Sequence, residues 1–130
     1  MQKILIIEDD PILSSALRDN LLYEGYTIIQ AKDGQEGLTR AESEKPDLIL
    51  LDIILPTMNG LDMLAKLRKD PWGKNVPVIL LSNLSEPPVV PGTPLEEVPK
   101  YLRKVDWKIE DVKKMIRAKL NERDSSALLG

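Results

Sequence analysis

Three residue types are missing from this 130-residue sequence: cysteine, histidine and phenylalanine. The absence of cysteine excludes disulfides, thiolate metal sites and thiol nucleophiles. The absence of histidine excludes an imidazole base and zinc ligation by histidine. Two tryptophans and three tyrosines are the only aromatic residues and the net charge is −3, so a nucleic-acid-binding surface is not expected. Chemistry in this chain must therefore use carboxylates, hydroxyls, lysine and a hard metal ion.

Long hydrophobic runs are also missing. No stretch approaches the roughly 20 apolar residues that a membrane span needs, and the apolar run near the start is too short for a signal peptide. A chain of this length fits one domain that buries roughly two-thirds of the surface of the unfolded chain. We therefore expect one cytoplasmic domain with a hydrophobic core.

Short continuous apolar runs alternate along the chain with longer segments of helical period. Continuous apolar strands are typical of a parallel sheet that helices cover on both faces. The apolar runs predict strands at Ile4–Ile7, Thr27–Ile29, Leu48–Leu51 and Val78–Leu81, with a weaker fifth strand at Tyr101–Arg103. The periodic segments predict helices at Pro11–Glu24, Gly34–Glu44, Gly60–Lys69 and from Ile109 to Leu120. This order predicts an α/β fold with a doubly wound, five-stranded parallel sheet.

One segment interrupts this alternation, between the fourth and fifth predicted strands. Half of the ten prolines lie there: Pro87, Pro88, Pro91, Pro94 and Pro99. A proline inside a helix costs about 3 kcal/mol and removes a backbone donor, so a regular helix is excluded. A single turn at Pro94–Val98 is the most that the pattern allows, with Thr93 as its cap.

Polar side chains follow the predicted strands at their carboxyl ends. Glu8, Asp9 and Asp10 follow the first strand, and Asp52 follows the third. Ligand sites of doubly wound sheets form at this edge. The first turn has no glycine to hold a phosphate, which argues against a flavin or dinucleotide site. Clustered carboxylates repel one another and need a cation, and an oxygen-only donor set suits Mg²⁺.

Four segments of the sequence together resemble the receiver domain of two-component response regulators: KILIIEDDP, PDLILLDIILPTMNG, PVILLS and YLRK. The resemblance covers roughly residues 2–120. It implies a flavodoxin-like sheet with strand order 2-1-3-4-5, whose fourth helix is missing here or reduced to one turn. We expect a receiver domain at residues 1–120, a frayed tail at residues 121–130 and no output domain.

The resemblance also implies roles for the acidic residues. Asp52 matches the aspartate that accepts a phosphoryl group from a phosphohistidine. Asp9 and Asp52 match direct ligands of Mg²⁺ (or Mn²⁺), Glu8 a ligand through water, and Ile54 a ligand through its backbone carbonyl. Asp10 matches none of these roles and is better explained as a helix N-cap before Pro11.

Three further residues receive roles from the resemblance. Ser82 matches a switch hydroxyl that contacts the phosphoryl group, and Lys104 matches the lysine that pairs with that group. Tyr101 matches the aromatic residue whose rotamer reports the phosphorylation state, although it could equally fill the core. The Asn59-Gly60 pair reads as a turn and cap that opens the third helix.

The sequence departs from the family pattern at three places. Val105 follows Lys104 where the family usually has proline, and Asn83 follows Ser82 where a small apolar residue is usual. The proline-rich segment stands where the family has its fourth helix, which forms part of the face used for dimers and output partners. The usual dimer face is therefore in doubt, whereas the acceptor chemistry is unaffected.

The leading hypothesis for function is a stand-alone receiver that takes a phosphoryl group from a sensor histidine kinase or a phosphotransfer protein and signals through protein contacts. It is not an enzyme in the usual sense, although it can assist its own phosphorylation and dephosphorylation. A second hypothesis is a receiver-like interaction module that works without phosphorylation. A third is a Mg²⁺-dependent phosphohydrolase with Asp52 as nucleophile, which the absence of an aspartate two residues later disfavours.

The proline-rich segment gives the first testable prediction. Residues 84–93 should exchange their amide hydrogens faster than the predicted strands, because five nearby prolines prevent a hydrogen-bonded helix. Hydrogen–deuterium exchange read by mass spectrometry measures this directly. Strong protection with helical periodicity in this segment would contradict the prediction.

Overall fold

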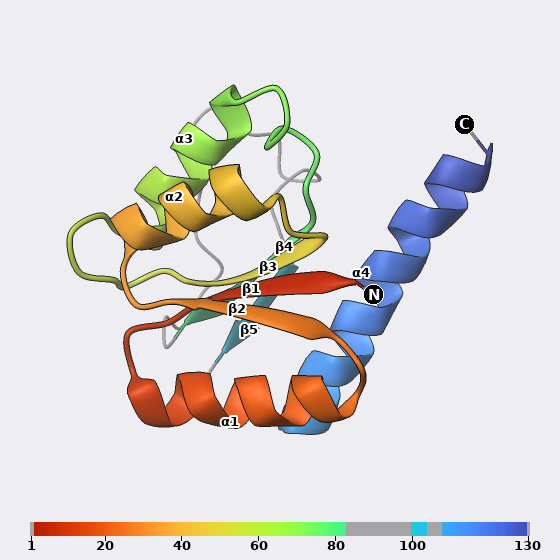
Figure 1. The fold of residues 1–130 in the computed structure, drawn as a ribbon, viewed down its shortest axis with the longest axis horizontal. Helices are drawn as coiled ribbons and strands as arrows, with labels where there is room; N and C mark the ends of the chain where they lie inside the picture. The colour runs from red at the N-terminus through yellow and green to blue at the C-terminus, as the bar shows by residue number, and fades with distance from the viewer. Residues whose placement is uncertain (1, 83–99, 104–107, 130) are drawn as a thin grey trace.

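The computed structural model describes residues 2–82, 100–103 and 108–129 of the chain, and in this part strands and helices alternate as predicted (Figure 1). The five strands are β1 (Lys3–Ile7), β2 (Thr27–Ala31), β3 (Leu48–Asp52), β4 (Val78–Ser82) and β5 (Lys100–Arg103). The helices in the described residues are α1 (Pro11–Tyr23), α2 (Gly34–Glu44), α3 (Gly60–Lys69) and α4 (Ile109–Leu129). The predicted replacement of a helix by the proline-rich segment lies outside the described residues.

All five strands pair in parallel in one sheet with the order β2-β1-β3-β4-β5. The central pair joins β1 to β3, with Ile4 opposite Leu48 and Ile7 opposite Leu51. This confirms the predicted flavodoxin-like order. It also places the ends of β1 and β3 side by side at the carboxyl edge of the sheet, where the acidic residues were predicted to gather.

The strands are apolar on both sides because a helical layer covers each face of the sheet. Helices α2 and α3 lie on one face, and α1 and α4 lie on the other (Figure 1). Leu5 and Ile7 of β1 point into the core beneath α2 and α3, whereas Ile4 and Ile6 point into the core beneath α1 and α4. The period of two along a strand thus divides the apolar side chains between two separate cores.

Side-chain caps fix where two of the helices begin. Asp33 accepts a hydrogen bond from the backbone of Glu36 at 2.8 Å, which starts α2. Asn59 accepts one from the backbone of Asp62 at 2.9 Å, which starts α3 and confirms the interpretation of this asparagine as a cap. The helices therefore start immediately after the loops that leave the carboxyl edge of the sheet.

An ion-pair cluster joins α4 to the end of α1. The ammonium of Lys113 lies 3.1 Å from the carboxylate of Glu24, the C-cap of α1, and 3.4 Å from that of Glu110. The hydrogen bond to Glu24 is the main cause that raises the pKa of Lys113, which is itself buried. This contact fixes α4 against α1 at the rim of their shared core.

The last helix continues further than the sequence pattern predicted. Val112, Ile116 and Leu120 are buried against the sheet, but α4 runs on to Leu129 and projects beyond the body of the domain (Figure 1). Residues 121–129 contain neither glycine nor proline, so helix propensity extends the helix where the apolar repeat has stopped. The domain boundary at residue 120 stays a prediction. No helix in the described part of the chain has both the length and the hydrophobicity to cross a bilayer.

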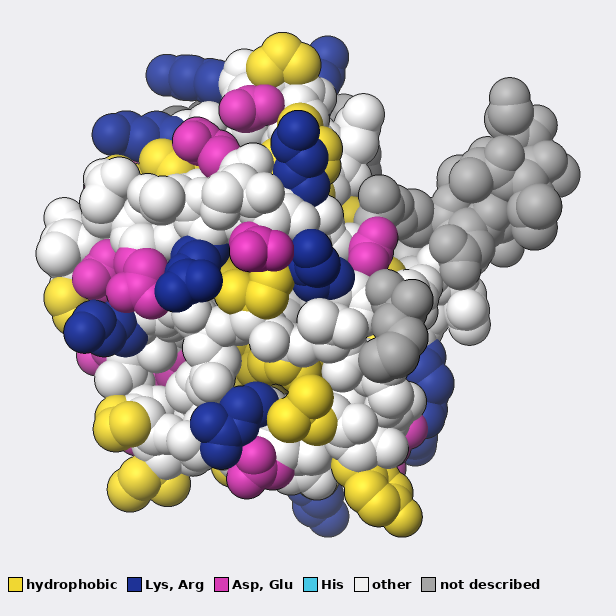
Figure 2. Space-filling view, viewed as in Figure 1, with side chains coloured by type: hydrophobic (Ala, Val, Ile, Leu, Met, Phe, Trp, Pro, Cys, Tyr) yellow, Lys and Arg dark blue, Asp and Glu magenta, His cyan; other side chains and the backbone are white. Residues whose placement is uncertain are grey.

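Charged side chains of both signs are mixed over the surface in Figure 2, which shows one face of the molecule. Basic side chains gather near α3, whose last turn contains Lys66, Arg68 and Lys69, but acidic side chains lie among them. This face therefore shows no continuous basic stripe of the kind that binds nucleic-acid backbones.

Arg68 gives a stability prediction for the connection from α3 to β4. Its guanidinium donates to the backbone carbonyls of Gly73, Lys74 and Val76 at 3.0, 3.4 and 2.7 Å, and partial burial lowers its pKa. Replacement Arg68→Met should lower the free energy of unfolding by about 1–3 kcal/mol, because it leaves these carbonyls without their donor. Urea denaturation measures the loss. Lys66→Met on the exposed side of α3 is the control and should change stability by less than about 0.5 kcal/mol.

Candidate metal site at the carboxyl edge of the sheet

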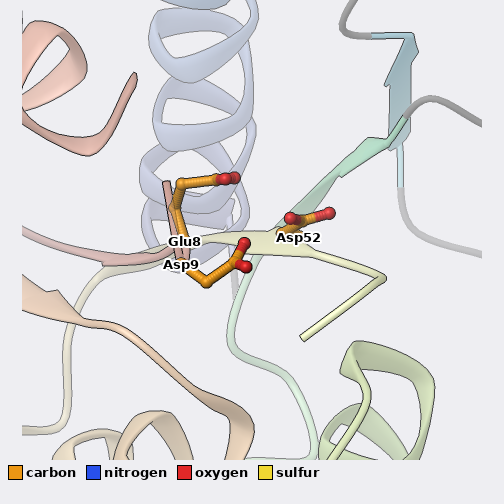
Figure 3. Close-up of side chains that lie close together, drawn as sticks. All are labelled: Glu8, Asp9 and Asp52. Carbon is orange, nitrogen blue, oxygen red and sulfur yellow. The ribbon is translucent and has the colours of Figure 1, made fainter. Parts of the chain in front are cut away.

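Three acidic side chains meet where β1 and β3 end. Glu8 and Asp9 follow β1 directly, and Asp52 is the last residue of β3. Because Ile7 lies opposite Leu51, the next residues of both strands are also neighbours. Figure 3 shows the Glu8 and Asp9 side chains extending toward Asp52. The structure thus brings together the acidic residues that the sequence placed at this edge.

The three carboxylates are close enough to share one cation. One oxygen from each lies within 4.8 Å of one oxygen from each of the others. Glu8 is 2% exposed and Asp52 is 3% exposed, whereas Asp9 is exposed to solvent. Two unit charges at such a separation repel by roughly 3.5 kcal/mol at an effective dielectric constant of about 20. Solvent at Asp9 weakens its share, but the repulsion between the two buried carboxylates remains.

The donor atoms of this cluster fit a hard divalent cation. All three side chains offer oxygen, which Mg²⁺ prefers, and none offers nitrogen or sulfur. The exposed position of Asp9 leaves one side of the cluster open to water, and Mg²⁺ usually keeps several water ligands. The observed cluster therefore fits the predicted cofactor.

Backbone amide groups two residues further along orient two of the carboxylates. The amide of Asp10 donates to Glu8 Oε1 at 3.2 Å, and the amide of Ile54 donates to Asp52 Oδ1 at 3.3 Å. In each turn an acidic side chain accepts from the main chain that follows it, and at Asp52 this is the geometry of an Asx turn. The direction of each carboxylate is therefore coupled to the backbone of its own loop.

Asp10 is separate from the cluster. Its Oδ1 accepts hydrogen bonds from the backbone of Ile12 at 3.0 Å and of Leu13 at 3.5 Å, with Pro11 at the first helical position. This confirms the interpretation of Asp10 as the N-cap of α1. The three consecutive acids of the first turn thus divide into two members of the cluster and one cap.

The loop at residues 53–59 passes close to the cluster and depends on a glycine that sequence reasoning treated only as a turn. The amide of Gly60 donates to the carbonyl of Ile53 at 2.7 Å and closes the base of the loop. A Cβ atom at Gly60 would overlap the carbonyl oxygen of Asp52. The Asn-Gly pair was the available signal, because glycine permits this close backbone approach.

The remaining predicted site residues are placed only in part. Ser82 ends β4, one residue beyond the pairing of Leu81 with Asp52, and Tyr101 lies in β5 opposite Leu80. The structure describes only the backbone of Ser82 and Tyr101, and Lys104 lies outside the described residues. Their predicted contacts therefore stay predictions. Strand β4 lies next to β3 and β5 lies next to β4. Because all are parallel, their carboxyl ends lie at the same edge of the sheet as the acidic cluster.

The sequence is similar to known proteins of one kind. Residues 4–117 match the family model described as the response regulator receiver domain. The chain is 41% identical over 86 residues to a DNA-binding dual master transcriptional regulator, RpaA, of Synechocystis, covering 66% of this chain and 36% of that protein. It is 44% identical over 68 residues to the alkaline phosphatase synthesis transcriptional regulatory protein PhoP of Bacillus subtilis, covering 52% and 28%. The chain spans about a third of the length of these curated relatives.

Solved structures that superpose on this chain include receiver domains. A CheY-like response regulator receiver domain protein from Methanospirillum hungatei superposes with a TM-score of 0.82 at 27% identity, covering 97% of this chain and 98% of that one. The receiver domain of the sensor histidine kinase PA1611 from Pseudomonas aeruginosa superposes with a TM-score of 0.79 at 26% identity, covering 92% and 98%. That structure holds a magnesium ion in its active-site cleft.

Two neighbouring substitutions separate the metal cluster from the helix cap. Asp9→Asn and Asp10→Asn each remove one negative charge, but asparagine at position 10 still caps α1. In EDTA, Asp9→Asn should raise Tm, because it relieves repulsion within the cluster. In MgCl₂ it should lose the rise in Tm that Mg²⁺ binding gives the wild type, whereas Asp10→Asn should keep it. Calorimetry with and without Mg²⁺ measures both effects.

A third variant tests the cap itself. Asp10→Ala should lower the free energy of unfolding by about 1 kcal/mol and still respond to Mg²⁺. If Asp10→Asn lost the Mg²⁺ response as completely as Asp9→Asn, the division of the first turn into cluster and cap would be wrong.

Proposed function

The chain belongs to the response regulator receiver domain family, and from this we propose that it accepts a phosphoryl group on Asp52 in two-component signalling. The observation that carries the proposal is the convergence of Glu8, Asp9 and Asp52, with ligand oxygens within 4.8 Å of one another. Receiver domains are signalling domains and bind Mg²⁺ in an acidic pocket of this kind. The proposed donor is a sensor histidine kinase or a phosphotransfer protein in the cytoplasm.

The proposed metal ligands come from both loops at this edge. Asp9 and Asp52 bind Mg²⁺ directly, Glu8 binds through water, and the backbone carbonyl of Ile54 completes the set that the protein provides. The exposure of Asp9 supports its direct role, because its carboxylate can reach an ion that is still partly hydrated. When bound there, Mg²⁺ would neutralise charge that develops on the oxygens of the moving phosphoryl group.

Asp52 performs the covalent step. One of its carboxylate oxygens forms a bond to phosphorus while the P–N bond of the donor's phosphohistidine breaks, and the imidazole leaves with the electron pair. The hydrogen bond from the Ile54 amide to Asp52 Oδ1 restricts the direction of this carboxylate. The Asp52 side chain is 3% exposed, so little of its surface is accessible to a donor. Histidine is absent from this chain, so the imidazole must come from the partner.

Residues on and after the neighbouring strands β4 and β5 respond to the phosphorylation of Asp52. Lys104 pairs with the phosphoryl oxygens, and the hydroxyl of Ser82 moves toward them, because the phosphorylated aspartate carries new hydrogen-bond acceptors. Tyr101 changes rotamer with Ser82 and alters the surface near β5. The chain then signals through contact with a downstream protein. The DNA binding named for RpaA is a property of that relative.

The phosphorylation assay tests this proposal. The protein is incubated with Mg²⁺ and acetyl phosphate, and its intact mass is measured by mass spectrometry. Wild type should gain one phosphoryl group with Mg²⁺ and none when EDTA is present from the start, because the transfer needs the metal. Asp52→Asn should gain none, because an amide oxygen is a much weaker nucleophile than a carboxylate.

A matched control excludes a general effect of removing a charge. Asp19→Asn changes an exposed aspartate of α1 in the same way and should be phosphorylated like the wild type. If wild type gains no phosphoryl group from acetyl phosphate or from phosphorylated kinase, acceptor function is excluded and the interaction module becomes the better hypothesis. Steady turnover of a phosphate ester that Asp52→Asn loses would instead indicate a phosphohydrolase.

A further inference from the structure

The first turn of α2 holds the loop at residues 53–59, which follows the proposed phosphoacceptor. The first amide groups of a helix have no partner inside the helix and must find one elsewhere. In α2, the amide of Gly34 donates to the carbonyl of Pro56 at 3.3 Å, and the amide of Gln35 donates to Thr57 Oγ1 at 3.4 Å. Two of the free donors of α2 thus form hydrogen bonds with the loop that connects β3 to α3.

Gly34 also sets how closely this loop approaches the helix. A Cβ atom at Gly34 would overlap the carbonyl oxygen of Met58 and would lie 2.9 Å from its side chain. The obstacle is main chain, so a rotamer change cannot remove it. Any larger residue at position 34 must therefore push the loop away from α2.

The tip of the loop is a tight turn centred on Thr57. The amide of Met58 donates to the carbonyl of Pro56 at 2.7 Å, across one residue, and Thr57 has a φ of 65°. This is a strained conformation for a β-branched residue. The hydroxyl contact with Gln35 compensates part of the strain, because it supplies a hydrogen bond that is made only when the tip lies on α2.

The same loop begins at the metal cluster. The amide of Ile54 contacts the carboxylate of Asp52, and the bond between Gly60 and Ile53 closes the loop at its base. The side chain of Ile54 is 63% exposed, so packing does little to fix it. The backbone at Ile54 is therefore held from its two sides, by the base of the loop and by the contact of the tip with α2.

We propose that Gly34 and Thr57 are positioning residues for the metal site: they hold the loop against α2, so that the Ile54 backbone and the Asp52 carboxylate keep the arrangement that binds Mg²⁺. This inference rests on the proposed function, because it assigns the Ile54 carbonyl to the metal. Neither residue contacts the ion. They act through the loop, in the way that residues in contact with metal ligands commonly orient those ligands.

Mg²⁺ affinity measured by NMR titration of the amide signals with MgCl₂ tests the inference without any phosphorylation. Gly34→Ala should raise the Kd for Mg²⁺ by about tenfold or more, the effect typical of losing a group that orients a ligand. Thr57→Val keeps the shape of the side chain but loses the hydroxyl, and should raise Kd by about two- to tenfold, the equivalent of one hydrogen bond. Thr57→Ser keeps the hydroxyl and should bind nearly as tightly as wild type.

Gly73→Ala provides a matched control for damage to the fold. A Cβ atom there would overlap the carbonyl oxygen of Leu67, but this contact lies at the last turn of α3, at the end of the helix away from the metal cluster. Gly73→Ala should lower Tm and leave Kd within about twofold of wild type, because distant sites are independent. If Gly34→Ala does not fold, the Thr57 pair still decides the question.

Two results would overturn the inference in distinguishable ways. Equal Mg²⁺ affinity in wild type, Gly34→Ala and Thr57→Val would exclude the positioning role and leave the acceptor function intact. No Mg²⁺ binding by wild type itself would remove the metal site, and with it both this inference and the proposed function.

Discussion

The parallel pairing of β1 with β3 is the constraint on which the rest of this structure depends. It brings Glu8 and Asp9 next to Asp52 although the carboxylates repel one another. That repulsion is tolerated because buried apolar residues on both faces of the sheet stabilise the pairing. These residues bury far more surface than the three carboxylates. The fold thus brings together three carboxylates that repel one another, an arrangement that a bound cation would stabilise. Sites of this kind gain their affinity from a scaffold that is stable without them.

Control of the site extends outward from the carboxylates through the main chain. The amides of Asp10 and Ile54 orient Glu8 and Asp52, so each turn determines the direction of its own acid. Gly60 brings the start of α3 against the end of β3, where any other side chain would collide with the Asp52 carbonyl. The directions of these carboxylates therefore depend on backbone groups in the turns and at the start of α3. The identity of the acidic side chains alone would not reveal this dependence.

Much of this could be predicted from the sequence, and the parts that could not were missed for two different reasons. Continuous apolar runs identified the strands, and caps such as Asp10 and Asn59 marked the helix starts, because these signals are local in the chain. The roles of Gly34 and Thr57 left no such signal, since they depend on contact between a helix and a loop that are distant in sequence. The length of α4 was missed for the opposite reason: propensity continued the helix after the apolar repeat had ended. The contacts of Ser82, Tyr101 and Lys104 stay predictions.

The division of the apolar side chains between two cores has a consequence for how such a protein can change. Leu5 and Ile7 pack into one core and Ile4 and Ile6 into the other, so in the described residues the two cores are separated by the strands. A substitution beneath α1 and α4 can be accommodated without repacking the layer of α2 and α3, which holds the loop at the metal site. The outer surface of α1 and α4 is thus free to diversify toward new partners while the chemistry at the sheet edge stays the same. Two cores on one sheet can in this way tolerate sequence change independently of each other.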